Sequence, residues 1–113
     1  MFDSVSSAAL SSALDGLAAR QRATADNIAN INTPHYLAQR VDFEDALRSS
    51  VDGGSGVAGI STSRSVAPTR EDGNNVNLDS ETLSDTDTQL RYQLVSQAMS
   101  DKFTAVSDAL KTS

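Results

Sequence analysis

The chain contains no cysteine and no tryptophan among its 113 residues. The missing cysteines exclude a disulfide framework and a thiolate metal site. Only 24 of the 113 residues are Leu, Ile, Val or Phe, which is close to the ~20% below which a chain tends to stay disordered. We therefore expect a thin hydrophobic core, formed by packed helices or completed by partner molecules.

Positive charge is also scarce, since 9 Lys and Arg face 15 Asp and Glu, for a net charge of −6. Binding of phosphate groups requires clustered basic residues, so the composition argues against nucleic acid and anionic membranes as partners. The first residues lack a basic segment, and no apolar run approaches ~18 residues. We expect no membrane insertion and no cleaved signal peptide, so any exit from the cytoplasm needs another route.

The N-terminal segment, residues 1–32, is predicted to be a helix from residue 4 onward. Apolar residues recur there at steps of three and four, with Gln21 and Thr24 as two polar positions in the middle. Pro34 predicts the end of the helix, because the residue before a proline is pushed out of the α region. The apolar positions are Leu10, Leu14, Leu17, Ile28 and Ile31.

Residues 33–78 form the predicted connection. Val41 and Phe43 alternate with a polar residue, which favours a short extended piece, and the spacing of Phe43 and Leu47 favours one or two helical turns after it. Residues 49–75 contain four of the six glycines and many serines. That composition predicts a flexible loop that projects, or that orders only on assembly.

The C-terminal segment, residues 79–113, is predicted to be a second helix, capped by Asp79 or Ser80, with Lys111 in its last turn. Its apolar stripe drifts around the helix. The predicted fold is therefore all-α: a single domain over residues 1–113 whose two long terminal helices pack as a coiled-coil-like pair. The stripe consists of Leu83, Leu90, Leu94, Met99, Phe103, Val106 and Leu110.

No motif for catalysis or ligand binding is found. His35 is the only histidine and sits beside a proline, where a turn residue is the simpler interpretation. The segment from Asp72 to Asn77 lacks the ligand spacing of a calcium loop, and glycines 53–59 match no phosphate-binding pattern. We expect no catalytic residue, no cofactor, no metal and no small-molecule substrate.

The segment Ala25–Tyr36, followed by Val41–Phe43, resembles the N-terminal signature of the bacterial flagellar axial proteins, which comprise rod and hook subunits. His35 stands where this family commonly has Gly. Glycine accepts a positive φ freely and histidine only at a cost, so the turn is either strained or differently shaped. The matching residues are Asn27, Ile28, Ala29, Asn30, Asn32, Thr33, Pro34, Tyr36 and Phe43.

A second block, beginning at Asn74, resembles the C-terminal signature of B-type proximal-rod proteins. The C-type proximal-rod proteins are the nearest alternative, and the Tyr92–Gln93 pair favours the B-type. Departures are Asp85, where an apolar residue is common, and Thr88, where Asn is common. The matching residues are Asn75, Val76, Asn77, Asp79, Glu81, Tyr92, Gln93 and Lys102.

This resemblance implies a non-enzymatic structural subunit of the proximal rod in the flagellar basal body. Such subunits leave the cytoplasm through the flagellar type III apparatus without a cleaved signal peptide. They assemble into the drive shaft that carries torque to the hook. Implied partners are other rod proteins, basal-body ring and export-gate components, and copies of the chain itself.

Within this resemblance, the two apolar stripes, Leu83 excepted, are the predicted assembly interface. The motif asparagines with Thr33 and Pro34 should end the first helix, while Tyr36 and Phe43 anchor the next segment.

Two other classes of protein are alternatives to the rod subunit. A cytoplasmic helical adaptor or export chaperone would be a stable dimer at micromolar concentration, and a small enzyme would need a concave site.

Overall fold

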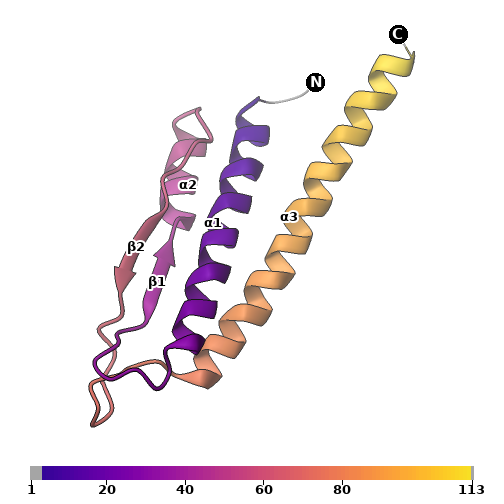
Figure 1. Cartoon of the computed structure of the whole chain (residues 1–113). Helices are drawn as coiled ribbons and strands as arrows, with labels where there is room; N and C mark the ends of the chain where they lie inside the picture. Colours follow the sequence, from indigo (N-terminus) through magenta and orange to yellow (C-terminus); the bar gives the residue numbers. More distant parts are fainter. Residues whose placement is uncertain (1–3, 113) are drawn as a thin grey trace.

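The computed structural model describes residues 4–112, so residues 1–3 and 113 of the two predicted terminal segments lie outside the described part. Three helices and two short strands follow one another along the chain (Figure 1). In chain order they are α1 (Ser4–Ala29), β1 (Gln39–Asp42), α2 (Glu44–Asp52), β2 (Ser61–Arg64) and α3 (Leu78–Thr112).

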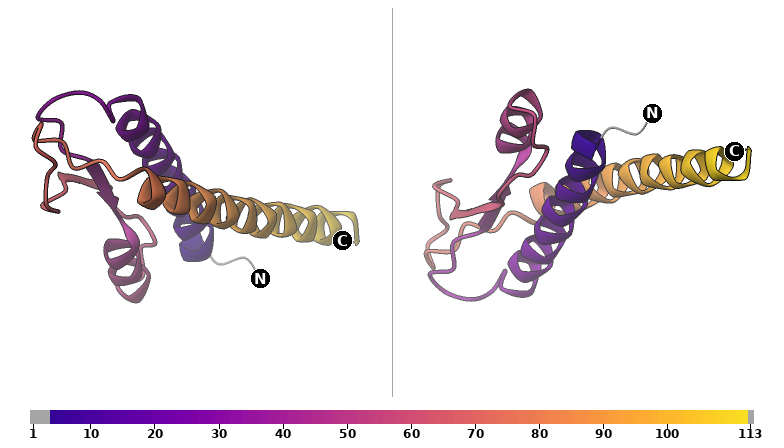
Figure 2. Two further views of the ribbon diagram at one scale, coloured as in Figure 1. Left: turned by 90° about the horizontal axis from the view of Figure 1, so that it is seen from below. Right: turned by 90° about the horizontal axis from the view of Figure 1, so that it is seen from above.

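Helix α1 lies between two other layers, with α3 on one side and the β1–α2–β2 segment on the other (Figure 1). Helices α1 and α3 run antiparallel, so the start of α1 and the end of α3 lie at the same end of the molecule (Figure 1). The molecule is elongated, with extents of 66 × 25 × 14 Å. Helix α3, with 35 residues against 26 in α1, crosses α1 at an angle and continues beyond it (Figure 2).

The two long terminal helices confirm the helical part of the predicted fold, but the connection between them is more ordered than expected. The predicted helical turns form α2. The expected extended piece is confirmed in β1 as far as Asp42, whereas Phe43 is the N-cap residue of α2. Strand β2, inside the segment expected to be flexible, pairs with β1 in an antiparallel ladder that sets Val41 opposite Thr62 and Arg40 opposite Ser63. An entirely α-helical fold was therefore too simple a prediction.

Helix α1 ends at Ala29, three residues before the predicted boundary. The carbonyl of Asn30 has no helical donor four residues ahead, because Pro34 has no N–H. That carbonyl instead accepts hydrogen bonds from the Thr33 N–H, at 3.0 Å, and from the side chain of Asn74, at 2.8 Å. Pro34 thus ends the regular helix several residues before its own position in the sequence.

The hydrophobic core is small and centres on Leu17, Ala23, Val41 and Phe43. The ring of Phe43 packs directly on Gly16 of α1, where an added Cβ would lie 2.5 Å from ring atoms. Glycine costs roughly 1 kcal/mol in a helix interior relative to Ala. Its presence here is explained by the space that Phe43 needs.

Candidate functional site

Asn27 holds three elements together at the end of the molecule where α1 finishes and α3 begins. Its side chain is 1% exposed. The amide Nδ2 donates to the Gln39 carbonyl at 3.0 Å, and Oδ1 accepts from the Gln39 N–H at 2.7 Å. Nδ2 also donates to Glu81 Oε1 at 2.9 Å, and Oδ1 accepts a 3.4 Å bond from the Tyr36 hydroxyl. The Asn27 amide therefore bonds the outward N–H and carbonyl of Gln39 in β1 and also links this strand to α3.

The side chain of Asn75 inserts between Ala38 and Ser65, next to the β1–β2 ladder. The Ser65 N–H donates to the Ala38 carbonyl at 2.7 Å, as in an ordinary bonded pair. The return bond is replaced by Asn75, whose Oδ1 accepts from the Ala38 N–H at 2.7 Å while Nδ2 donates to the carbonyls of Ser65 and Ala67, each at 3.1 Å. The strands can thus diverge here while the Ala38 N–H and the Ser65 carbonyl stay bonded.

Asn74, with 0% exposure, connects the segment before α3 to the turn after α1. Its Nδ2 donates to the carbonyls of Asn30 and Thr33, at 2.8 and 2.9 Å. Its Oδ1 accepts from the Val76 N–H at 2.7 Å, and its own N–H donates to Asp72 Oδ1 at 3.0 Å. The amide nitrogen and oxygen of Asn74 are therefore both hydrogen-bonded, as is usual for buried polar groups.

The turn after α1 contains His35 at φ 62°, the one non-glycine residue of positive φ between residues 4 and 112. Its N–H donates to the Asp72 carbonyl at 2.9 Å. The side chain lies over Gly73, where an added Cβ would approach Nδ1 to 2.5 Å. The turn therefore keeps the backbone shape that a glycine would favour, and His35 adopts it under strain.

Helix α3 begins with a side-chain cap from Asn77. Its Oδ1 accepts from the Ser80 N–H at 3.1 Å, and its carbonyl accepts from the Glu81 N–H at 2.9 Å. The prediction that Asp79 or Ser80 caps this helix was wrong by two or three residues. The helix starts earlier because the buried Asn74 and Asn75 hold the chain in place up to Val76. Asn77 is then the first exposed residue that can cap the helix.

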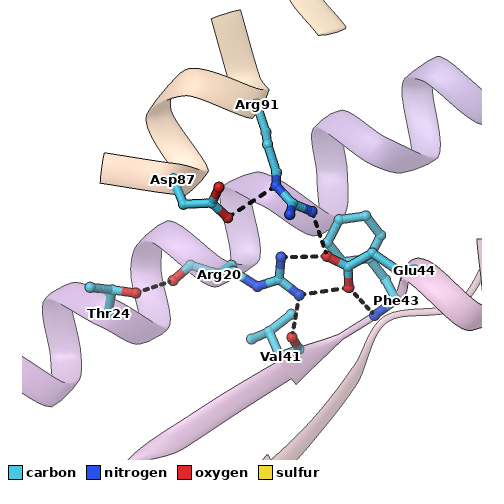
Figure 3. A network of polar contacts seen from close by, with 7 residues as sticks. All are labelled: Arg20, Thr24, Val41, Phe43, Glu44, Asp87 and Arg91. Atoms are coloured by element: carbon cyan, nitrogen blue, oxygen red, sulfur yellow. Dashed lines mark hydrogen bonds and ion pairs between the residues drawn. The ribbon is translucent and has the colours of Figure 1, made fainter. Parts of the chain in front are cut away.

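A second polar cluster joins α1, α2 and α3 (Figure 3). Arg20 binds Glu44 through two hydrogen bonds, of 2.6 and 2.7 Å, donates to the Val41 carbonyl at 2.7 Å and stacks on the Phe43 ring. From α3, Arg91 lies 3.5 Å from the same carboxylate. The bonds from Arg20 lower the pKa of Glu44 to about 2, against the opposing effect of burial.

Glu81 and Thr88 are polar residues on the face of α3 that is turned toward α1. Burial raises the pKa of Glu81, while the hydrogen bond from Asn27 opposes that shift. The hydroxyl of Thr88, at 0% exposure, has no hydrogen-bond partner within residues 4–112. The surfaces of α1 and α3 that face each other therefore include buried polar groups beside apolar residues such as Leu17 and Val95.

The predicted apolar stripes are only partly buried in the helix pair. Of the α1 stripe, Leu17 is buried, Leu10, Leu14 and Ile31 are half-buried, and Ile28 is exposed. Of the α3 stripe, Met99 and Val106 are half-buried. The exposed α3 residues are Leu83, Leu90, Leu94, Phe103 and Leu110.

The drift of the α3 stripe explains this arrangement. Leu83, Leu90 and Leu94 follow at steps of seven and four, which keeps them on one face. The step of five to Met99 turns the stripe by roughly 140° around the helix. Phe103 and Leu110 consequently lie on another side. The helix pair therefore leaves most large apolar residues of the α3 stripe exposed, and the assembly interface stays a prediction.

Other matching residues of the two sequence blocks lie at the surface. Ala29, Asn32, Thr33 and Pro34 are exposed around the turn, as are Asp79, Tyr92 and Gln93 on α3. Lys102 is half-buried and lines a cleft of about 210 Å³ with Ser7, Met99, Phe103 and Val106. Asn30 donates to the Asp26 carbonyl at 2.8 Å and accepts from the Thr33 hydroxyl at 3.1 Å.

Sequence reasoning missed Arg20, Glu44 and Arg91 as a cluster, because no local pattern brings together charges 24 or more positions apart. The resemblance assigns no role to Asn74, the first residue of the second block. Its preference for turns gave no sign of a partner 44 positions away. Among residues 4–112, no three His, Asp or Glu side chains gather closely enough to hold a metal ion. None of the described helices combines the length and apolarity needed to cross a membrane.

Comparisons with known proteins agree on one family. The family model described as "Flagella basal body rod protein" matches residues 9–36, which include Asn27. The chain is 30% identical to the flagellar basal body rod protein FlgB of Borreliella burgdorferi over 122 aligned positions, which cover 87% of this chain and 90% of that protein. The chain therefore belongs to the family of flagellar basal body rod proteins, which makes it a structural component of the basal-body rod rather than an enzyme.

Proposed function

We propose that the chain is a proximal-rod subunit. It packs against neighbouring axial proteins through the apolar residues of α3 and the apolar stripe of α1. The observation that carries this proposal is the exposure of large apolar side chains on α3: Leu94 is 63% exposed and Phe103 73%. A chain with so few apolar residues gains nothing from placing them in water as a monomer. Contact with neighbours gives these residues a role.

A groove beside Leu94 supports this interface. It has a volume of about 250 Å³ and lies between α1, α2 and α3, with Leu17, Phe43 and Val95 among its lining residues. Its rim holds Glu44 and Arg91, whose charges are paired with each other. A side chain from a neighbouring subunit can therefore enter an apolar groove whose rim presents no unpaired charge.

The same proposal includes the route and the mechanical role. The chain leaves the cytoplasm through the flagellar type III apparatus without a cleaved signal peptide, and it contacts other rod proteins, ring and export-gate components and copies of itself. The small core supports export, since little apolar burial opposes unfolding before passage through a channel. Torque passes between subunits by side-chain packing.

The test replaces Leu94 with Asp in a bacterium that lacks its own copy of this rod protein. Because Leu94 is exposed, the variant should fold, as judged by its helical circular dichroism, yet fail to restore swimming, since a charge buried at the interface is costly. The matched control is Gln93→Asp, which adds the same charge on a neighbouring exposed position. Mass spectrometry of purified basal bodies should find the control and not Leu94→Asp. Normal swimming with Leu94→Asp would contradict the proposed interface.

A further inference from the structure

Strand β2 has one paired edge and one open edge. The ladder bond from the Ser65 N–H to the Ala38 carbonyl fixes which residues of β2 face β1. Bonded and non-bonded pairs alternate in an antiparallel ladder. Ser61 and Ser63 therefore bond to β1, while Thr62 and Arg64 turn their N–H and carbonyl groups outward. No partner for these outward groups lies within residues 4–112.

The other edge of this small sheet is closed. On β1, the outward N–H and carbonyl of Gln39 are both bonded to the Asn27 side chain. The outward carbonyl of Val41 accepts from Arg20 Nη2 at 2.7 Å. Side chains of α1 thus occupy the place that another strand would take. Any further strand can join this sheet only at β2.

The open edge is short, at four residues, but it lacks other features that normally protect a strand from pairing with another chain. Residues 60–66 contain no proline, no glycine and no lysine. The one charged side chain, Arg64, turns back to donate to the Leu37 carbonyl at 2.9 Å and to stack on the Tyr36 ring at 5.3 Å. Both ends of the edge are apolar and exposed, with Ile60 at 40% and Val66 at 95%.

We propose that β2 is a self-association edge, at which β2 of a second copy of this chain pairs antiparallel about Ser63 to form a four-stranded sheet. The sequence Ile60–Val66 is nearly self-complementary about that centre. Thr62 faces Arg64 of the second copy, and Ile60 faces Val66 of the second copy. Thr62 and Arg64 have outward backbone groups, so the two Thr62–Arg64 pairs of this register form the hydrogen bonds between the copies. The two Ile–Val contacts cover apolar side chains that are otherwise in water.

The pairing should be weak and should stop at two copies. A short strand edge buries far less than the ~1,200–2,000 Å² of a stable protein interface. A two-fold contact uses the same surface on both copies and is therefore closed. Strand β2 lies on the side of α1 opposite to α3 (Figure 1), so the dimer leaves the α3 stripe free. This inference does not depend on the proposed rod interface.

Amide hydrogen exchange measured by NMR on the full chain tests the inference residue by residue. On going from low micromolar to near-millimolar concentration, exchange at Thr62 and Arg64 should slow several-fold. Exchange at Ser61 and Ser63, already bonded to β1, should stay constant. Sedimentation should show the mass rising toward a dimer over the same range. Equally fast exchange at Thr62 and Arg64 at both concentrations would overturn the inference, as would a dimer that leaves these two amides unprotected.

A matched pair of substitutions isolates the edge. Thr62→Arg places two cations against each other across the new pair, since Thr62 faces Arg64 of the second copy, and it should abolish the concentration dependence. Thr69→Arg adds the same charge at an exposed position outside the strand and should dimerise like the parent chain. Thr62→Pro removes one outward N–H and no ladder bond, so it should weaken pairing with the fold intact. Unchanged dimerisation of Thr62→Arg would count against the edge.

Discussion

The two ends of helix α3 are stabilised in opposite ways. Its first turns are anchored by buried asparagines: Asn27 bonds to the Glu81 side chain, and just before the helix the amides of Asn74 and Asn75 bond to backbone groups of the segment between α1 and β1. Its last turns carry Phe103 and Leu110 in solvent, each 73% exposed. In this chain, polar side chains determine the fold of the single subunit, whereas a large share of the apolar side chains is available for contacts outside it.

The chemistry of the two residue classes explains the division. A buried amide has fixed donor and acceptor directions and tolerates only one register, because an unbonded polar group in the interior is costly. Apolar contacts have no such direction and suit several neighbours. A chain with a small core can therefore obtain a unique fold from asparagines while leaving leucines and phenylalanines at its surface.

The largest expected effect comes from breaking the polar end at Asn27. Asn27→Ala leaves the N–H and carbonyl of Gln39 and the carboxylate of Glu81 without their partner. The free energy of unfolding in urea should fall by about 3 kcal/mol, given ~1–3 kcal/mol for each buried group left unbonded.

Asn32→Ala serves as the control for Asn27, because it changes an exposed asparagine of the same motif. Its effect should stay within ~0.5 kcal/mol, as for ordinary surface substitutions. Equal losses from the two variants would refute the idea that buried amides specify the fold of the subunit.

The same contrast decides how much of the fold could be predicted. The spacing of apolar residues at three and four positions is a local signal, and it correctly placed α1 and α3. Strand β2 contains only Ser, Thr and Arg, so neither alternation nor hydrophobicity indicated it. Its order depends on pairing with β1 and on Asn75, whose contacts reach Ala38 at a separation of 37 positions. Composition alone therefore favoured a flexible loop.

For the candidate site, the resemblance indicated that Asn27, Asn30 and Asn75 matter, and the structure gives their bonds. It did not indicate which side of α3 would face α1. That orientation is set by Glu81 bonding to Asn27 and by Val95 packing near the core. Both are contacts between segments far apart in the chain, which no local pattern encodes.

The Arg20–Glu44 pair gives a second way to sharpen the comparison, through pH. The pKa of Glu44 falls from an ordinary 4.5 to about 2 in the folded chain. Because the folded pKa is the lower one, the stabilisation is complete above pH 4.5 and is lost as pH falls toward 2. With the carboxylate 39% exposed, solvent screening limits the loss to about 1 kcal/mol. Urea unfolding between pH 6 and pH 2.5 measures it.

The control for that titration is Glu44→Gln, in which this part of the pH dependence should disappear. Glu81 acts in the opposite sense. Its pKa is raised, so its contribution is present below pH 4.5 and is lost as pH rises through the raised value. A parent chain and a Glu44→Gln variant with the same loss of stability toward low pH would show that the Arg20 bonds contribute nothing.

The smallest expected effect concerns the strained turn at His35. A residue other than glycine in the left-handed region costs ~1–2 kcal/mol, while a glycine loses ~0.4–1 kcal/mol through the greater freedom of the unfolded chain. His35→Gly should therefore raise the free energy of unfolding by about 0.5 kcal/mol, less whatever contact the imidazole makes over Gly73.

Asn32→Gly tests whether that gain is specific to the positive φ. Asn32 is exposed and lies three residues away with a negative φ, so glycine there should bring only the entropic loss and lower stability by about 0.5 kcal/mol. The two glycine substitutions should thus have opposite signs in the same urea experiment. If both glycine variants lowered the free energy of unfolding, the imidazole contact over Gly73 would outweigh the backbone strain at His35. The turn held by the buried asparagines would then suit histidine as well as glycine.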